Sequence, residues 1–255
     1  MKRALALLIF ATGFLIAQEV PRAQPVDPAL NADAENDFYL RGKNLYDSAQ
    51  DSAVQENRVD LYQRAAAIFE QYLNDFPRSP NAEPALFYLG SSLYQSGRVN
   101  DGKRCFSTLL NRFGNSKWSA SAAYILAADY YNKAEYAAAA PLFERFASNT
   151  TKPEERVRGN YLAGVCYRIE GSDRQAIAAY QKVIQDPAGG LYAPQSKIAI
   201  GSFTLKDGKL LEALAIFEEV AAGPHSAKSV VKPPCKPPSP PRNSTKPTFP
   251  KNIFS

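Results

Sequence analysis

Five aromatic residues spaced by 37 positions constrain the fold of this chain most strongly. They are Phe69, Phe106, Phe143, Tyr180 and Phe217. Two series of small residues have the same spacing: Ala65, Gly102, Ala139, Ala176 and Ala213, four positions before the aromatic residues, and Gly90, Ala127, Gly164 and Gly201. Self-similarity at a period of about 20 to 50 residues is typical of proteins built from stacked repeats. The sequence therefore predicts a repeat protein.

Each repeat has the pattern of two closely packed helices. Small residues let two helices approach each other, and an aromatic residue four positions later lies on the same helical face. Glycines that end the first helix of a hairpin fit this pattern, and they are Gly97, Gly171 and Gly208. Before the second hairpin, Ser79 is expected to cap a helix that begins at Pro80. We expect an all-α, right-handed α-solenoid of about five helical hairpins with a 37-residue period, with the aromatic rings between hairpins.

The repeats are expected to occupy residues 35–222, with segments of different character on both sides. Residues 1–17 have the pattern of a cleaved signal peptide, with Lys2 and Arg3 before an apolar stretch. An uncleaved anchor is the alternative, although a membrane span needs about 20 apolar residues. No cysteine lies directly after this stretch, so we expect no lipid anchor. Residues 18–34 are predicted to be a flexible lead, and the first repeat is irregular.

Residues 223–255 are predicted to be a basic, proline-rich, disordered tail. From Lys228 onward the sequence contains eight prolines, which a helix does not tolerate in its interior. Three interpretations stay open for this tail: a recognition arm, an inert linker, or the result of a reading-frame change that truncated a longer array.

The net charge of +5 does not indicate a nucleic-acid partner. Six basic residues lie from Lys228 onward and two lie in the leader, and without these eight the middle of the chain carries −3. A folded domain of that charge is not expected to bind a polyanion.

The sequence contains little material for catalysis or metal binding. His225 is the single histidine, which leaves no candidate for a histidine-based triad or metal site. The three cysteines, Cys105, Cys166 and Cys235, are too few for a disulfide scaffold. Cys105 and Cys166 lie two repeats apart in an array where only neighbours meet, so we expect no bridge between them. We expect no cofactor, no metal and no enzymatic activity.

The repeat resembles the tetratricopeptide family. The matching positions are Leu89, Gly90, Leu93, Gly102 and Phe106, then Ala127, Tyr130, Ala139 and Phe143, then Gly164, Tyr167, Ala176 and Tyr180. The usual unit has about 34 residues. The longer unit and the Phe76-Pro77 junction look like exported envelope proteins of Gram-negative bacteria. Two such groups are the lipoprotein partner of the outer-membrane barrel-assembly machine and the periplasmic coordinator of the Tol-Pal system. The chain lacks the lipid-acceptor cysteine of the first and the coiled-coil stretch of the second.

This resemblance implies that the first helices of the hairpins line a concave, protein-binding groove. The side chains expected to project into it are Phe87, Tyr94, Tyr124, Tyr131, Tyr161 and Arg168. Tyrosine and arginine are favoured at protein-binding surfaces, because they offer large contact area at low entropy cost. We expect the groove to hold an extended or helical peptide. The alternative is that several of these residues pack between neighbouring repeats.

These observations predict a periplasmic protein–protein interaction scaffold in cell-envelope assembly, at the outer membrane or in division. Its expected partner is an envelope protein or peptide, and peripheral association with outer-membrane machinery is also expected. A peptidoglycan- or glycan-binding module is the alternative, because tyrosines can also stack against sugars.

Overall fold

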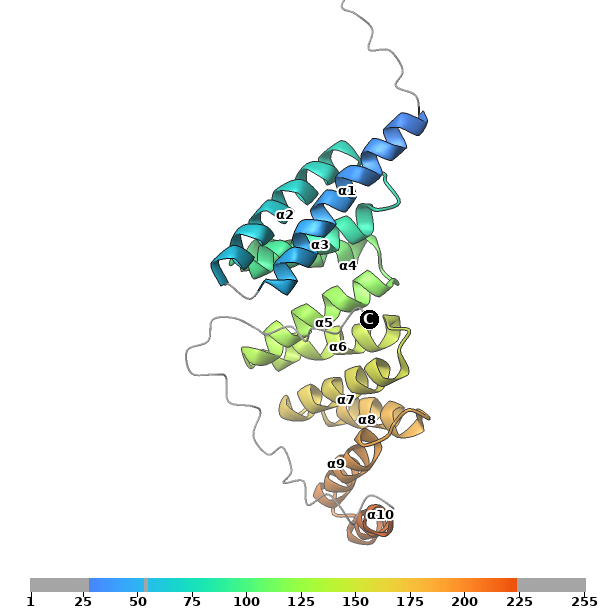
Figure 1. Cartoon of the computed structure of the whole chain (residues 1–255). Helices are drawn as coiled ribbons and strands as arrows, with labels where there is room; N and C mark the ends of the chain where they lie inside the picture. The colour runs from blue at the N-terminus through green and yellow to red at the C-terminus, as the bar shows by residue number, and fades with distance from the viewer. Residues whose placement is uncertain (1–27, 53–54, 224–255) are drawn as a thin grey trace, which may run out of the picture.

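The structure is a computed structural model that describes residues 28–52 and 55–223. Within them it has ten helices, namely α1 (Pro28–Asp51), α2 (Gln55–Asp75), α3 (Ala82–Gln95), α4 (Val99–Arg112), α5 (Lys117–Asn132), α6 (Tyr136–Asn149), α7 (Pro153–Ile169), α8 (Asp173–Gln185), α9 (Tyr192–Lys206) and α10 (Leu210–Ala222). They form antiparallel pairs that stack from α1 and α2 at the upper end of Figure 1 to α9 and α10 at the lower end. The all-α stack of helical hairpins predicted from the repeats is confirmed.

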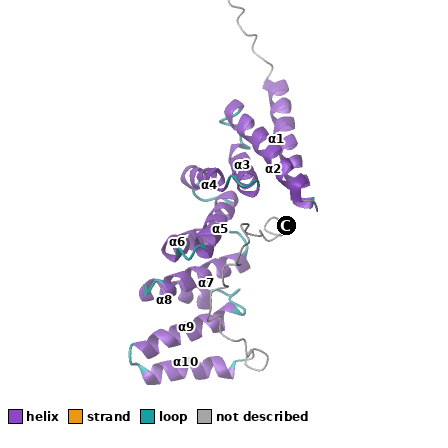
Figure 2. Cartoon of the chain, turned by 90° about the vertical axis from the view of Figure 1, so that its left-hand side faces the viewer, coloured by secondary structure: helices purple, strands orange, loops and turns teal. Residues whose placement is uncertain are grey.

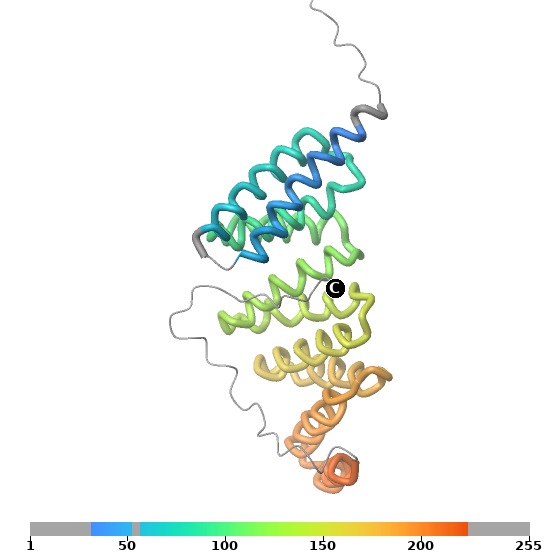
Figure 3. The backbone as a smooth tube through the Cα atoms, in the orientation of Figure 1, coloured from blue at the N-terminus to red at the C-terminus, as the bar shows by residue number. Residues whose placement is uncertain are grey.

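Each helix packs mainly against the helix before it and the helix after it, as the side view shows (Figure 2). The backbone path therefore winds steadily from one end of the array to the other (Figure 3). The core is continuous along this path, because α5 contributes Ile125 to the apolar cluster of the first half and Ala127 to that of the second. Packing between sequence neighbours is the general property of solenoids.

The small and aromatic series meet inside each hairpin. A Cβ atom added to Gly90 in α3 would lie 2.9 Å from the ring of Phe106 in α4, which is closer than such atoms approach. The same relationship holds in later hairpins, for Gly164 with Tyr180 at 2.7 Å and for Gly201 with Phe217 at 2.6 Å. The aromatic side chain thus packs onto the glycine of its own hairpin. Phe106, Tyr180 and Phe217 therefore pack inside their own hairpins, whereas Phe69 also lies between hairpins as expected, with its ring 5.4 Å from that of Tyr88 in α3.

The first hairpin is longer than the others and has its own register. Its helices have 24 and 21 residues, and in it Phe69 packs against Gly42, where a Cβ would lie 3.0 Å from the ring. The small residue here precedes the ring by 27 positions instead of 16. The eleven extra residues make about three helical turns, so the same faces still meet.

Two expected boundaries differ from the structure. Helix α1 begins at Pro28, inside the expected lead of residues 18–34. Its Glu35 carboxylate accepts a hydrogen bond of 2.9 Å from the Tyr72 hydroxyl, which attaches the start of α1 to α2. Helix α3 begins at Ala82 and not at Pro80, because the Ser79 hydroxyl accepts a hydrogen bond from the backbone of Asn81 and closes a turn before the helix.

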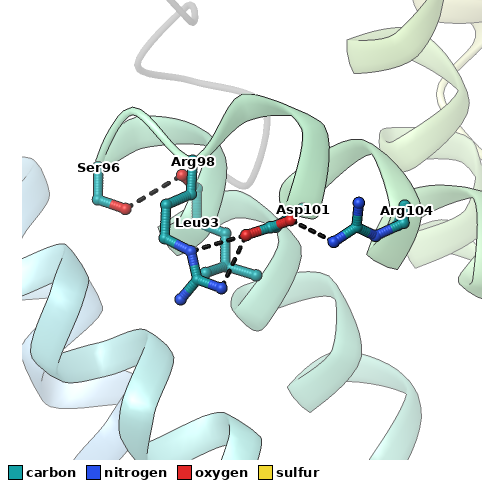
Figure 4. Close-up of polar contacts among 5 residues, drawn as sticks. All are labelled: Leu93, Ser96, Arg98, Asp101 and Arg104. Atoms are coloured by element: carbon teal, nitrogen blue, oxygen red, sulfur yellow. Dashed lines mark hydrogen bonds and ion pairs between the residues drawn. The ribbon is translucent and has the colours of Figure 1, made fainter.

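The turns inside the hairpins use a left-handed residue at intervals of 37. These residues are Gly97 (φ 97°), Ala134 (φ 61°), Gly171 (φ 74°) and Gly208 (φ 78°). Figure 4 shows side chains around the first of these turns. The Ser96 hydroxyl donates a hydrogen bond of 3.0 Å to the carbonyl of Leu93, and the Asp101 carboxylate accepts one of 2.7 Å from Arg98. Ala134 adopts the glycine conformation without being glycine, so the sequence pattern did not reveal it.

Several predictions fall on other parts of the chain. The expected signal peptide of residues 1–17, His225, Cys235 and all but the first residue of the expected tail 223–255 lie outside the described residues. Among the residues that are described, no helix has both the length and the apolar character needed to cross a membrane.

Candidate functional site

Two of the six residues expected on the binding face belong to the core. Phe87 is fully buried, with its ring 5.2 Å from that of Trp118 and 5.8 Å from that of Phe106. Tyr94 is only 4% exposed. The first turn of α5 supplies Trp118, which covers Phe87. Phe87 and Tyr94 are therefore not available to a partner, and for them the alternative of packing between repeats is correct.

Tyr94 takes part in a buried polar cluster between the second and third hairpins. Its hydroxyl donates a hydrogen bond of 2.9 Å to the carboxylate of Asp129, which Lys133 approaches at 3.1 Å and Lys103 also contacts. Burial raises the pKa of Asp129, but the hydrogen bonds from Lys103, Lys133 and Tyr94 outweigh it and hold this pKa below its ordinary value. This cluster connects α3, α4 and α5, and its role is structural.

Tyr124 and Tyr131 lie on one side of α5, seven residues and thus two turns apart. Both are half-buried. The ring of Tyr124 lies 4.9 Å from that of Phe146, and the ring of Tyr131 lies 5.4 Å from that of Tyr136. These contacts hold the two tyrosines in place while leaving part of each ring accessible.

Tyr161 and Arg168 have the same seven-residue spacing on α7. The half-buried ring of Tyr161 lies 5.0 Å from that of Tyr192, whereas Arg168 is exposed. Burial raises the pKa of both Tyr131 and Tyr161, and the positive charge of Arg168 opposes the rise at both. Arg168 is therefore close enough to act on both tyrosines, and the structure brings together three of the six predicted residues, Tyr131, Tyr161 and Arg168.

A fifth residue on this face, Arg158, was missed by the repeat analysis. Its guanidinium lies over the ring of Tyr124 at 5.0 Å and near that of Phe146 at 5.9 Å. Its Nε atom is buried without a hydrogen-bond partner in the described structure. We call the set Tyr124, Tyr131, Arg158, Tyr161 and Arg168 the tyrosine–arginine face.

The sequence signal that could have pointed to Arg158 is a missing aromatic residue in the first turn of the fourth hairpin. In the neighbouring hairpins the first turn of the next hairpin covers the corresponding ring, with Trp118 over Phe87 and Tyr192 beside Tyr161. The position midway between Trp118 and Tyr192 is Glu155. Arg158 fills the place that an aromatic side chain would otherwise occupy over Tyr124.

The cysteines of the described region have no catalytic environment. Cys105 and Cys166 are free thiols, so the expectation that they do not form a bridge is confirmed. Burial raises the pKa of Cys105 to about 11 and that of Cys166 to about 12, which keeps both thiols protonated at neutral pH. In the part of the chain that the structure describes, no three histidine, cysteine, aspartate or glutamate side chains converge as metal ligands would.

Comparison with known protein families gives a match in the middle of the chain. Residues 83–197 match the family described as "YfiO: Outer membrane lipoprotein". This stretch runs from α3 into α9 and includes the whole tyrosine–arginine face. No curated protein and no solved structure matches the chain. The chain is thus an all-α protein of stacked helical hairpins, and its central hairpins are similar to the YfiO family of outer membrane lipoproteins.

Proposed function

We propose that the chain is a periplasmic scaffold that binds other envelope proteins through the tyrosine–arginine face, in outer-membrane or division assembly. The family match supports a place in the cell envelope, since the matching family is described as an outer membrane lipoprotein. The matched residues lie within the repeats, so the lipid anchor in that description remains a property of the family. We propose further that the chain has no enzymatic activity.

The observation that carries this proposal is a pair of arginines set among fixed tyrosines. Among the described side chains, neither Arg158 nor Arg168 has a carboxylate partner. Tyrosine rings held by neighbours lose little entropy on binding. A protein segment that brings carboxylates to the arginines and apolar area to the tyrosines would fit this face.

The spacing of the two arginines suggests the size of such a segment. They are ten residues apart on α7, which corresponds to about 15 Å along a helix axis. An extended peptide covers this distance in about four or five residues. We propose a partner segment with two acidic residues at that separation, or with one acidic residue and an apolar residue.

A single charge reversal on the exposed arginine tests the proposal more cleanly than alanine substitutions. Replacing Tyr124, Tyr131 and Tyr161 by alanine would remove rings that pack on the core, at a cost of about 3–5 kcal/mol for a fully buried ring. Loss of binding would then not be distinguishable from unfolding. Arg168→Glu changes an exposed side chain, and Arg174→Glu makes the same change on the exposed side of α8 as a matched control.

Affinity capture from an envelope fraction would compare the wild type with these two variants. We expect one set of envelope proteins to be retained by the wild type and by Arg174→Glu, and to be lost with Arg168→Glu. Equal retention by all three would contradict the assignment of the face. Retention of purified peptidoglycan by the wild type, without any retained protein, would support the glycan-binding alternative.

A further inference from the structure

The last helix, α10, lies at the lower end of the array (Figure 1), and it carries an exposed apolar ridge. Leu210, Leu211 and Leu214 are 65%, 83% and 52% exposed, which is far more than leucines in a helix usually are. Glu218 continues the line of Leu211 and Leu214, because residues three, four and seven apart share a helical face. We call Leu210, Leu211, Leu214 and Glu218 the α10 ridge.

The exposure of Leu211 differs from what its repeat position predicts. The equivalent positions in the three preceding hairpins are also exposed, and they hold Asn100, Ala137 and Arg174. A leucine at a position that faces solvent throughout the array indicates a contact that the inner hairpins do not make.

The opposite end of the array has a groove between α1 and α2. Its volume is about 520 Å3, and its lining combines an apolar floor with two arginines. The lining residues are Arg41, Asn44, Leu45, Ser48, Arg64, Ala67 and Ile68. Arg64 pairs with Asp60 at 3.6 Å, but both side chains are more than 60% exposed, so this pair is weak. Arg41 has no carboxylate partner among the described side chains.

The two ends are complementary in apolar surface and in charge. The α10 ridge offers projecting leucines and the unpaired carboxylate of Glu218, whereas the groove offers apolar surface from Leu45 and Ile68 beside Arg41. Because the positions equivalent to Leu211 are exposed in the inner hairpins, this contact would differ from the packing of one hairpin on the next inside the array.

We propose that this chain associates head to tail, with the α10 ridge of one copy bound in the α1–α2 groove of a second copy. The contact joins two different surfaces, so it leaves a free ridge and a free groove at the two ends of a dimer. The same contact then adds further copies. An interface of two helix pairs is small, so we expect association at micromolar rather than nanomolar concentrations.

Sedimentation velocity over a concentration series tests this association on the purified chain. We expect the wild type to form larger species as concentration rises. Leu211→Glu in the ridge and the double variant Arg41→Glu/Arg64→Glu in the groove should each weaken association by about tenfold or more. Leu191→Glu is the matched control, since Leu191 is 69% exposed but lies before α9, and it should associate like the wild type. A monomeric wild type at the highest concentration would overturn the proposal.

A mixing experiment separates head-to-tail association from a symmetric pairing of two α10 helices. The Leu211→Glu variant keeps its groove, and the Arg41→Glu/Arg64→Glu variant keeps its ridge. Mixed in equal amounts, they should form dimers and nothing larger. If two α10 helices paired symmetrically instead, the groove variant alone would associate as strongly as the wild type. This result would overturn the head-to-tail arrangement. Circular dichroism of each variant would show that these surface changes leave the helices intact.

Discussion

The hydroxyl of Tyr94 in α3 donates a hydrogen bond of 2.9 Å to the carboxylate of Asp129 in α5, across the junction between the second and third hairpins. Because Asp129 is only 8% exposed, its charge depends on the donors around it, which also include Lys103 and Lys133. A buried charge with several donors stabilises a junction only while the donors are present. The stability of this junction should therefore respond to single-atom changes.

Replacing Tyr94 by phenylalanine should destabilise the fold without changing the binding face. The variant loses a buried hydrogen bond to a charged acceptor, which is worth about 1.5–3 kcal/mol. Tyr131→Phe is the matched control one repeat later, because the structure gives its hydroxyl no hydrogen bond, and its effect should be much smaller. Urea unfolding of both variants measures the difference. Equal effects would show that the Tyr94 bond contributes nothing specific.

The contribution of Asp129 should depend on pH. Its pKa in the folded protein lies below the ordinary value of about 3.9, so its charged form stabilises the fold above that value. The contribution is lost as the pH falls through the folded pKa. The free energy of unfolding should therefore differ most between the wild type and Asp129→Asn at neutral pH, and the difference should shrink below about pH 4. A difference that stays constant between pH 7 and pH 3 would contradict this account.

Ala134 is a site where glycine should stabilise the protein. Its φ of 61° lies in the left-handed region, which costs a non-glycine residue about 1–2 kcal/mol. Ala134→Gly should raise the melting temperature. The reverse change, Gly171→Ala, should lower it by the same mechanism, since no atom lies within 4 Å of an added Cβ there. If both substitutions left the melting temperature unchanged, the turns would not carry this strain.

The close contact between Gly164 and Tyr180 predicts a steric cost for a single methyl group. In Gly164→Ala the new Cβ would lie 2.7 Å from the ring, so α7 and α8 would have to move apart. Overpacking of this kind costs about 1–3 kcal/mol. Gly114→Ala is the control, because its nearest neighbour would be the Arg145 side chain at 4.0 Å, and it should be nearly neutral. Chemical unfolding of the two variants measures the contrast.

Repetition explains which parts of the fold could be predicted. The helices, the glycine turns and the small–aromatic pairs recur every 37 residues, so each copy supports the interpretation of the others. The first hairpin departs from this period by three helical turns, and its Gly42–Phe69 contact was therefore not visible in the pattern.

The binding face was only partly predictable, because burial depends on contacts between hairpins. Whether a first-helix aromatic is exposed is decided by a residue about 30 positions later, as with Trp118 over Phe87. Arg158 has no equivalent in the neighbouring repeats, where its positions are Ser121 and Gln195, so periodicity gave no reason to select it. Arg168 is exposed, so its place on a binding face stays a prediction.

Site-specific photo-crosslinking in living cells tests the binding face most directly. A photo-reactive amino acid would replace Arg168 on the tyrosine–arginine face in one strain and Arg174 on α8 in another, since both side chains are exposed arginines. The account predicts crosslinks to an envelope protein from position 168 and none to that protein from position 174. Crosslinks of equal yield from both positions, or from position 174 alone, would contradict it.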